Sequence, residues 1–325
     1  MIARVGFVGL GAMGEAMARS LRKAGLDVFA SVHRHRDALE RLRADGVREA
    51  ADPASLARDA EAVVISVPDA PDVEDVLFAV RGVAAGAKAG LLVIDTSTIS
   101  PVASRRFAER LAERGIEFVD APVSGGPARA QDGTLTIMVG ASPAAFSRAE
   151  PVLRAMGTPH HLGPVGMGET VKLVNQIIIA NVMIANVEGL SFAQRAGADL
   201  GIVREVLASA TASNYLLEEW LPKTWLGGTF SGGFALDLLR KDLAAALDTA
   251  RAASLPMPAT ALAHQLYTTR SAEGDGALDY SAIAKAYEWN VGDAAAANDG
   301  NQGSGGQQED PRRGRRVRDP SNLAL

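Results

Sequence analysis

The sequence predicts an α/β protein in which an N-terminal, doubly wound parallel sheet is followed by an all-helical C-terminal domain. Short apolar runs alternate with helical patterns over residues 1–165. A glycine-rich turn, GLGAMG, follows the first of these runs, and from residue 166 helical patterns succeed one another with little strand signal. Alternating strands and helices favour a parallel sheet, because each crossover helix covers one face of it.

The expected elements follow from the spacing of apolar residues. Apolar runs bounded by turn residues predict strands that are covered on both faces, and spacings of three and four predict helices. The expected strands of the first half are 4–8, 27–32, 62–67, 90–95 and one beginning at 118, and its expected helices are 15–24, 38–43 and 101–114. The expected helices of the second half are 171–197, 201–213, 236–253, 258–273 and 280–288.

The glycine-rich turn has the form G-x-G-x-x-G and lies between a predicted strand and a predicted helix. Gly9 permits a tight turn, Gly11 lets the backbone approach a pyrophosphate, and Gly14 allows close packing of helix on strand. The alternative is a glycine-rich turn without a ligand, but the order of strand, motif and helix favours a dinucleotide. The positions expected to bind it are Gly9, Leu10, Gly11, Ala12, Met13 and Gly14.

The end of the second predicted strand bears on the choice of nicotinamide cofactor. An acidic residue about 20 residues after the glycines would hold a ribose 2′-hydroxyl. Here the chain reads SVHRHR, with no acidic residue before Asp37. The cationic group of His33, Arg34 and Arg36 suits a 2′-phosphate, so we expect NADP to be preferred to NAD. The alternative is that these are exposed residues at a helix start and that NAD serves equally well.

Composition excludes several kinds of site. The 325-residue chain has a formal net charge of −5, which argues against a general nucleic-acid or membrane binder. It has no cysteine, which excludes disulfides, thiolate zinc sites and a cysteine nucleophile. Its five histidines show no metal-binding spacing, so we expect no metal. The chemistry must use lysine, serine, amides, carboxylates, the backbone or a cofactor.

Two further segments carry polar groups in unusual places. Lys172, Asn175 and Gln176 stand at i, i+3 and i+4 within an apolar segment, which places them on one face of a helix. The alternative for Lys172 is a side chain that extends from a buried helix to solvent. Ser124, Gly125 and Gly126 offer a hydroxyl and consecutive amides, which suit a carboxylate. The alternative for this loop is a flexible turn.

The chain resembles the β-hydroxyacid dehydrogenase family, which includes 3-hydroxyisobutyrate dehydrogenase and tartronate semialdehyde (2-hydroxy-3-oxopropionate) reductase. The matching segments occur in the family's order and cover about residues 2–290. They are GLGAMG, DTSTISP, DAPVSGG, GTLTIMVG, GPVGMGETVKLVNQ and FALDLLRKDL. The resemblance implies a Rossmann domain, a long connecting helix, and a helical domain that completes the active site and the oligomer interface.

The resemblance also implies residue roles. Lys172 matches the catalytic lysine. The positions matching substrate-binding residues are Ser124, Gly125, Gly126, Asn175, Gln176 and Lys241, and those matching the cofactor site include Val67, Pro68, Ser97 and Lys241. Many family members have two asparagines after K-x-x, whereas this chain has Asn175 and Gln176. The asparagine–glutamine form is more similar to tartronate semialdehyde reductases than to 3-hydroxyisobutyrate dehydrogenases.

The expected function is therefore hydride transfer between nicotinamide and a short 3-hydroxy acid or semialdehyde acid. We expect Lys172 to exchange the proton, with its pKa lowered by desolvation and by Lys241. Expected substrates are tartronate semialdehyde or, as the alternative, methylmalonate semialdehyde. More distant alternatives are an imine reductase, against which Lys172 argues, and a non-catalytic NADP-binding module.

The remaining expectations concern organisation and location. We expect a Rossmann domain over 1–165, a helical substrate and oligomerisation domain over 166–291, and a disordered tail over 292–325. The basic stretch Arg312–Arg318 could touch nucleic acid, although a solvated terminus is favoured. The start of the chain lacks signal-peptide features, which indicates a cytoplasmic protein. The polar-interrupted run 173–187 is expected to be too short and too polar to span a bilayer, and a homodimer or homotetramer is expected.

Overall fold

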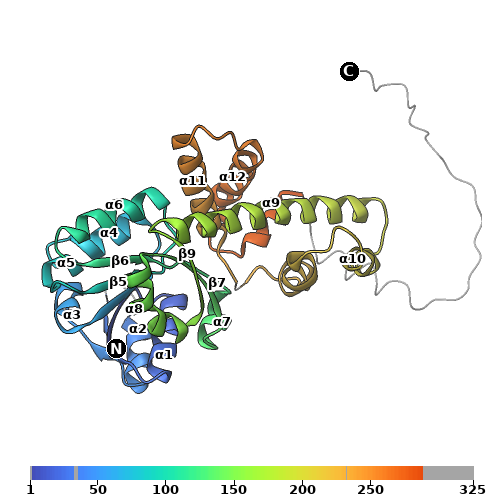
Figure 1. Cartoon of the computed structure of the whole chain (residues 1–325). Coiled ribbons are helices and arrows are strands. Elements are labelled where there is room, and N and C mark those ends of the chain that lie inside the picture. The colour runs from blue at the N-terminus through green and yellow to red at the C-terminus, as the bar shows by residue number, and fades with distance from the viewer. Residues whose placement is uncertain (1, 33–35, 232, 288–325) are drawn as a thin grey trace, which may run out of the picture. The chain divides into compact units, whose positions relative to one another are not determined.

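A nine-stranded sheet organises the first half of the part of the chain that the structure describes (Figure 1). The computed structural model describes residues 2–32, 36–231 and 233–287. The expected tail over 292–325, with Arg312–Arg318, and the expected residues His33 and Arg34 lie outside these ranges.

The strands run in the order β3-β2-β1-β4-β5-β6-β8-β7, and β9 pairs with β8. Their bounds are β1 Arg4–Val8, β2 Asp27–Ser31, β3 Arg48–Glu49, β4 Ala62–Ile65, β5 Leu92–Asp95, β6 Glu117–Asp120, β7 Val123–Ser124, β8 Leu135–Gly140 and β9 Gly157–Gly163. Pairing is parallel except where β8 meets β6 and β7. The expected strands are present, whereas β3, β7, β8 and β9 were not expected.

Helices cover both faces of this sheet. Their bounds are α1 Ala12–Lys23, α2 Arg36–Ala44, α3 Pro53–Asp59, α4 Ala70–Phe78, α5 Val83–Gly86, α6 Pro101–Ala112, α7 Gly126–Gln131 and α8 Pro143–Arg154. Val64 of β4 packs in one buried cluster with α1, α2 and α8, whereas its neighbours Val63 and Ile65 pack in another with α3, α4 and α6. Both faces of β4 are therefore buried from solvent, as expected for a strand whose residues are all apolar.

The second half consists of helices and short helical turns. Their bounds are α9 Met167–Arg195, α10 Leu200–Ala208, α11 Leu236–Ala252 and α12 Pro258–Arg270, with the turns η1 Leu216–Trp220, η2 Leu221–Lys223, η3 Trp225–Gly227, η4 Ser271–Asp275 and η5 Tyr280–Tyr287. Helix α9 packs against β8, β9 and α6 of the first half and against α10, α11 and α12 of the second. Figure 1 shows it running past α11 and α12 towards α10.

Helix α9 corresponds to the helix expected over 171–197 and extends beyond the apolar run 173–187 at both ends. Its 29 residues, with a mean hydropathy of 1.4 in the best window, are long and apolar enough to cross a membrane by length and composition alone. The expectation that this run is too short and too polar was therefore wrong on that criterion, because the helix begins before the run and ends after it. Buried Glu169, Lys172 and Gln176 and contacts with the sheet are instead typical of a core helix.

A carboxylate from the sheet caps the start of α9. The N-cap residue is Gly166, which has a φ of 93° and no side chain to accept a hydrogen bond. Asp120, at the end of β6, accepts from the Gly166 amide at 2.7 Å and from the Glu169 amide at 2.9 Å. A Cβ on Gly140 would lie 2.3 Å from Asp120 Oδ1, and one on Gly168 would lie 2.9 Å from Oδ2. Asp120 thus fixes the start of α9 against the sheet.

We expect Asp120→Asn to lower the free energy of unfolding by about 1–3 kcal/mol, because its amide group can accept only one of the two buried N–H bonds. Urea denaturation measures this loss. The matched control is Asp199→Asn at the exposed N-cap of α10, where Asp199 accepts from the Ile202 amide at 3.0 Å. The control should lose less than about 1 kcal/mol. Equal losses in the two variants would contradict the special role of Asp120.

Candidate active site

The turns after β1, β4 and β5 lie side by side at one edge of the sheet. This follows from the parallel pairing of β1 with β4 and of β4 with β5. The chain leaves β1 towards β2 and β3 on one side, and then returns to build β4, β5 and β6 on the other. In open α/β sheets such a reversal of strand order opens a crevice at the carboxyl ends of the strands, where ligands bind.

The glycine turn after β1 has the geometry of a phosphate-binding turn. Gly9 has a φ of 95°, and a Cβ there would lie 2.0 Å from the carbonyl oxygen of Ser66. A Cβ on Gly14 would lie 1.9 Å from the carbonyl oxygen of Gly9. A Cβ on Gly11, in contrast, would meet nothing within 4 Å. Two glycines are therefore needed for packing, and the third leaves the start of α1 open to a pyrophosphate, so the residues fit a dinucleotide.

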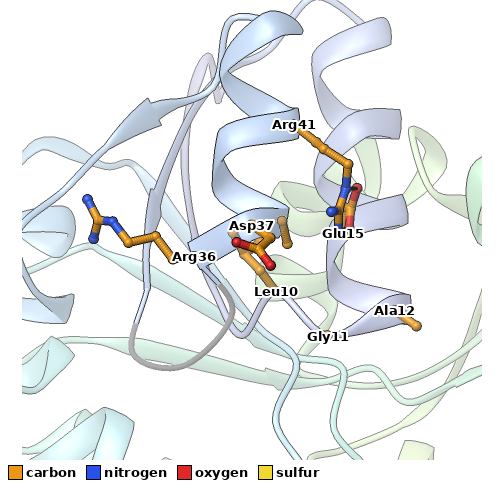
Figure 2. A pocket seen from close by; sticks show the side chains of 8 residues that line it. Leu10, Gly11, Ala12, Glu15, Arg36, Asp37 and Arg41 are labelled. Atoms are coloured by element: carbon orange, nitrogen blue, oxygen red, sulfur yellow. Dashed lines mark hydrogen bonds and ion pairs between the residues drawn. The ribbon is translucent and has the colours of Figure 1, made fainter.

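A hollow of about 440 Å³ lies beside this turn. Figure 2 shows its lining residues, which are Leu10, Gly11, Ala12, Glu15, Arg36, Asp37, Ala38 and Arg41. Arg36 binds Glu49 at 3.0 Å, and in the view it points away from Gly11. Arg41 binds Glu15 through two hydrogen bonds of 2.9 and 2.7 Å. The structure thus places the expected Arg36 at this hollow and adds Arg41 and Asp37, which we did not expect there.

Two more expected cofactor residues are brought into contact across neighbouring turns. The amide of Val67, after β4, donates to the hydroxyl of Ser97, after β5, at 3.0 Å. The amide of Ser97 in turn donates to Asp95 Oδ1 at 3.0 Å. Pro68 follows Val67 directly. The hydrogen bonds fix these turns relative to each other beside the glycine turn.

The expected lysines and amides converge on one buried carboxylate, Asp242 of α11, which is 1% exposed. Lys241 Nζ lies 2.8 Å from Asp242 Oδ1. Gln176 donates to Asp242 Oδ2 at 2.7 Å, and Asn175 donates to the Gln176 side-chain oxygen at 2.8 Å. Both ends of the Gln176 amide are thus occupied within the protein, so Gln176 links α9 to α11.

Lys172 lies at this network with only 6% of its surface exposed. Burial lowers its pKa, the charge of Lys241 lowers it further, and the charges of Asp242 and Glu169 act in the opposite direction. The shift has the direction and the two causes that we expected from the sequence. Lys172 Nζ also lies 5.9 Å from the centre of the Phe234 ring. The arrangement gives an amine that can lose its proton more easily than an ordinary lysine.

Lys241 also joins the helical half to the cofactor side. Its ammonium group donates to the carbonyl oxygen of Thr98, in the turn after β5 that carries Ser97. Lys172, Lys241, Gln176 and Ser97 are therefore parts of one connected region. This is the constellation that the sequence predicted, with the added detail that Asp242 holds it together.

The expected carboxylate loop joins β7 to α7 in the first half of the chain. Ser124 ends β7, and α7 begins at Gly126. Gly125 and Gly126 have φ angles of 136° and 70°, which other residues rarely adopt. A Cβ on Gly126 would meet nothing within 4 Å, so its backbone faces open space. Among the described residues, the Ser124 side chain forms no hydrogen bond with Lys172, Lys241 or Gln176.

The sequence analysis missed Asp242 and a group of buried carboxylates. Asp242 directly follows Lys241 in the RKDL segment, and an acid next to a lysine on an apolar helix was the available signal. Asp95, Asp120 and Glu169 are each 0% exposed. The first two begin the segments DTSTISP and DAPVSGG, but nothing in their spacing shows that Glu169 joins them.

Comparisons with known proteins identify the family of the chain. A model described as the NAD binding domain of 6-phosphogluconate dehydrogenase matches residues 4–172, and one described as NAD-binding of NADP-dependent 3-hydroxyisobutyrate dehydrogenase matches residues 166–287. The chain is 39% identical over 287 residues to 2-hydroxy-3-oxopropionate reductase from Escherichia coli, covering 88% of this chain and 97% of that protein. It is 37% identical over 294 residues to 2-(hydroxymethyl)glutarate dehydrogenase from Eubacterium barkeri, covering 89% and 96%.

A solved structure shares the fold over nearly its whole length. The crystal structure of 3-hydroxyisobutyrate dehydrogenase from Salmonella typhimurium superimposes with a TM-score of 0.78 at 35% identity, and the match covers 87% of this chain and 99% of that one. The expected sequence of a Rossmann sheet followed by helices is confirmed. The chain belongs to the β-hydroxyacid dehydrogenase family and is a nicotinamide-dependent oxidoreductase.

Proposed function

We propose that the protein reduces a short semialdehyde acid to the corresponding 3-hydroxy acid, and that tartronate semialdehyde is its preferred substrate. The observation that carries the reaction type is Lys172, a buried amine of lowered pKa within a network that also holds Lys241 and Gln176. The observation that favours this substrate is the Asn175–Gln176 pair, together with 39% identity to 2-hydroxy-3-oxopropionate reductase.

The nicotinamide cofactor supplies or accepts the hydride. Lys172 donates a proton to the carbonyl oxygen during reduction, and its neutral amine takes the hydroxyl proton during oxidation. Ser124 with the amides of Gly125 and Gly126 binds the substrate carboxylate and orients it. Asn175 orients Gln176, and Gln176 orients the Lys172 face of α9 by its hydrogen bond to Asp242. Lys241 fixes the turn that carries Ser97 by its hydrogen bond to Thr98. The glycine turn from Gly9 to Gly14 binds the pyrophosphate.

One of the three alternatives has an observation in its favour. The similarity to 3-hydroxyisobutyrate dehydrogenase from Salmonella typhimurium supports methylmalonate semialdehyde as the substrate. Imine reductases share the fold at 16–22% identity, which shows the fold alone. A non-catalytic NADP-binding module is disfavoured, because it would not need a buried lysine whose charge is costly to keep out of water.

We also propose that NADP is preferred to NAD. Arg36 and Arg41 line the hollow beside the glycine turn and could each turn from their present carboxylate partners to a 2′-phosphate. Asp37 lines the same hollow and would favour the 2′-hydroxyl of NAD. The basis of the proposal is that both arginines can reach the hollow, which Glu15 and Asp37 also line, together with the absence of an acidic residue before Asp37 in SVHRHR. His33 and Arg34 remain expected contributors.

The substrate and cofactor proposals are tested together by initial rates of NADPH and NADH oxidation with a panel of short semialdehydes. We expect the largest kcat/KM with NADPH and tartronate semialdehyde. A preference for methylmalonate semialdehyde would move the assignment to 3-hydroxyisobutyrate dehydrogenase. An NADH efficiency equal to or above that of NADPH would overturn the cofactor proposal, and cofactor binding without any turnover would favour the non-catalytic module.

Replacing the proposed acid–base residue, Lys172→Ala, should lower kcat by roughly 10²- to 10⁴-fold, the usual contribution of general acid–base catalysis. In the wild type, the oxidation rate should rise with pH through the lowered pKa of Lys172, and the reduction rate should fall over the same range. The control variant is Lys223→Ala, an exposed lysine that pairs with Glu219. A Lys172→Ala enzyme with nearly wild-type kcat would show that another group carries the proton.

The remaining proposals concern the state of the protein. We propose a cytoplasmic enzyme with no membrane and no nucleic-acid partner, divided into domains 1–165 and 166–291 and a tail over 292–325. We also propose a homodimer or homotetramer. Exposed apolar side chains on α9 and α10 support self-association. They are Val174 at 48%, Ile178 at 55%, Phe192 at 77%, Ile202 at 64% and Val206 at 60% exposure.

Light scattering of the purified chain measures the assembly directly. We expect a mass of two or four chains, and we expect Phe192→Asp to shift it towards the monomer, because a charge at this apolar position would be costly to bury. The control is Val80→Asp on the first half, where the side chain is 96% exposed. A wild-type chain that stays monomeric at all concentrations would overturn the proposal.

A further inference from the structure

Two carboxylic acids that the proposed chemistry does not use are fully buried, one at the end of β5 and one at the start of α9. Asp95, at the end of β5, and Glu169, in the first turn of α9, are both 0% exposed. Each has one oxygen that accepts a backbone hydrogen bond: Asp95 Oδ1 from the Ser97 amide at 3.0 Å, and Glu169 Oε2 from the Ile99 amide at 3.2 Å. The other oxygen of each, Asp95 Oδ2 and Glu169 Oε1, is buried without a hydrogen-bond partner.

The charged groups around this pair leave it without an ion-pair contact in the described part of the chain, and Lys241 attracts both acids and Lys172 attracts Glu169 only from a longer distance. Asp120 of β6 carries a like charge and is bound to the start of α9. Lys241 of α11 is held by Asp242 and by the carbonyl oxygen of Thr98. Among the described residues, no lysine, arginine or histidine forms an ion pair with Asp95 or Glu169. Two buried carboxylates without an ion-pair partner would be very costly if both were ionised.

We propose that Asp95 and Glu169 share one proton, with Glu169 Oε1 donating a hydrogen bond to Asp95 Oδ2, and that Glu169 is thereby a positioning residue for Lys172. One proton satisfies both of the oxygens that lack partners. It also removes one negative charge from a site where, among the described residues, no cation forms an ion pair with either acid. The pKa values agree in direction: burial raises the pKa of Asp95 to about 7 and that of Glu169 well above its ordinary value.

The shared proton links helix α9, which carries Lys172, to the turn after β5, which carries Ser97. Catalysis requires these two elements to keep a fixed distance. Glu169 precedes Lys172 by three residues, so one turn of α9 separates them. On the other side, Asp95 and Ile99 bracket the turn that carries Ser97 and Thr98. The carboxyl pair therefore sets the distance between the lysine helix and the turn beside the cofactor. This part of the inference rests on the proposed function, whereas the shared proton itself does not.

A neutral Glu169 also matters for the charge of Lys172. An ionised Glu169 would raise the pKa of Lys172, since the two charges attract each other. A protonated Glu169 exerts no such attraction. The pair thus keeps Lys172 able to exchange its proton while still holding the helix in place.

The first test is the pH dependence of unfolding in the full chain, which needs no substrate. A carboxyl whose pKa is raised by folding stabilises the protein fully below its unfolded pKa, and this stability is lost as the pH rises through the folded pKa. Between about pH 5.5 and 7.5, the unfolding equilibrium constant of the wild type should therefore rise about tenfold per pH unit more steeply than that of Glu169→Gln. The glutamine amide can replace the proton by donating to Asp95.

The matched control for this test is Glu113→Gln, an exposed glutamate on the same half of the chain. It should keep the wild-type pH dependence. If Glu169→Gln also keeps it, Glu169 is ionised in the folded protein and the shared proton is ruled out. This outcome is independent of any enzyme activity, so it cannot be confused with failure of the proposed function.

The second test separates positioning from general stability. Glu169→Ala should lower kcat about tenfold with little change in substrate KM, and Glu169→Gln should restore most of the rate and keep the wild-type pH profile. A shift of the Lys172 limb to lower pH in Glu169→Gln would mean that a negative charge had been removed, which would overturn the proposal. Wild-type kcat in a folded Glu169→Ala enzyme would overturn the positioning role. If Glu169→Ala does not fold, the pH profile of kcat in Glu169→Gln still tests whether Glu169 is protonated.

Discussion

The proposed chemistry depends on the burial of one amine, that of Lys172. Its pKa is lowered by burial, and nearby carboxylates partly stabilise its charged form. Burial makes the ammonium form costly, and Asp242 returns part of that cost by electrostatic attraction. Gln176 of α9 donates to Asp242 Oδ2 and Lys241 forms an ion pair with Oδ1, so the carboxylate joins α9 to α11. A lysine balanced in this way releases its proton more easily than a surface lysine does.

The fold supplies this site by bringing a long helix to the carboxyl end of a parallel sheet. The same edge gathers the glycine turn after β1, the Val67 turn after β4 and the Ser97 turn after β5, because those strands are neighbours. Asp120 then fixes where α9 begins, since it caps a helix whose own N-cap residue is a glycine. The edge of the sheet thus positions the turns of the cofactor site, and the start of α9 positions Lys172.

Much of this was predictable from the sequence because it is local. Apolar runs predicted β1, β2, β4 and β5, glycine spacing predicted the turn, and spacing on one helix predicted that Lys172 and Gln176 share a face. The strands β3 and β7 have only two residues each, too few for a pattern. Contacts between distant segments, such as those of Asp242 with Gln176 and of Glu169 with the Ile99 amide, leave no periodic trace. The role of Arg41 likewise depends on how α2 packs beside the glycine turn.

The most direct test of the account is the pKa of Lys172 itself, measured by NMR titration of isotope-labelled lysine in the purified protein. The resonance would be assigned by its loss in Lys172→Arg. The account predicts a value below that of an ordinary lysine, about 10.4, and a rise towards it when Lys241 is replaced by methionine. A Lys172 that titrates at or above the ordinary value would contradict the central claim that burial prepares it for proton exchange.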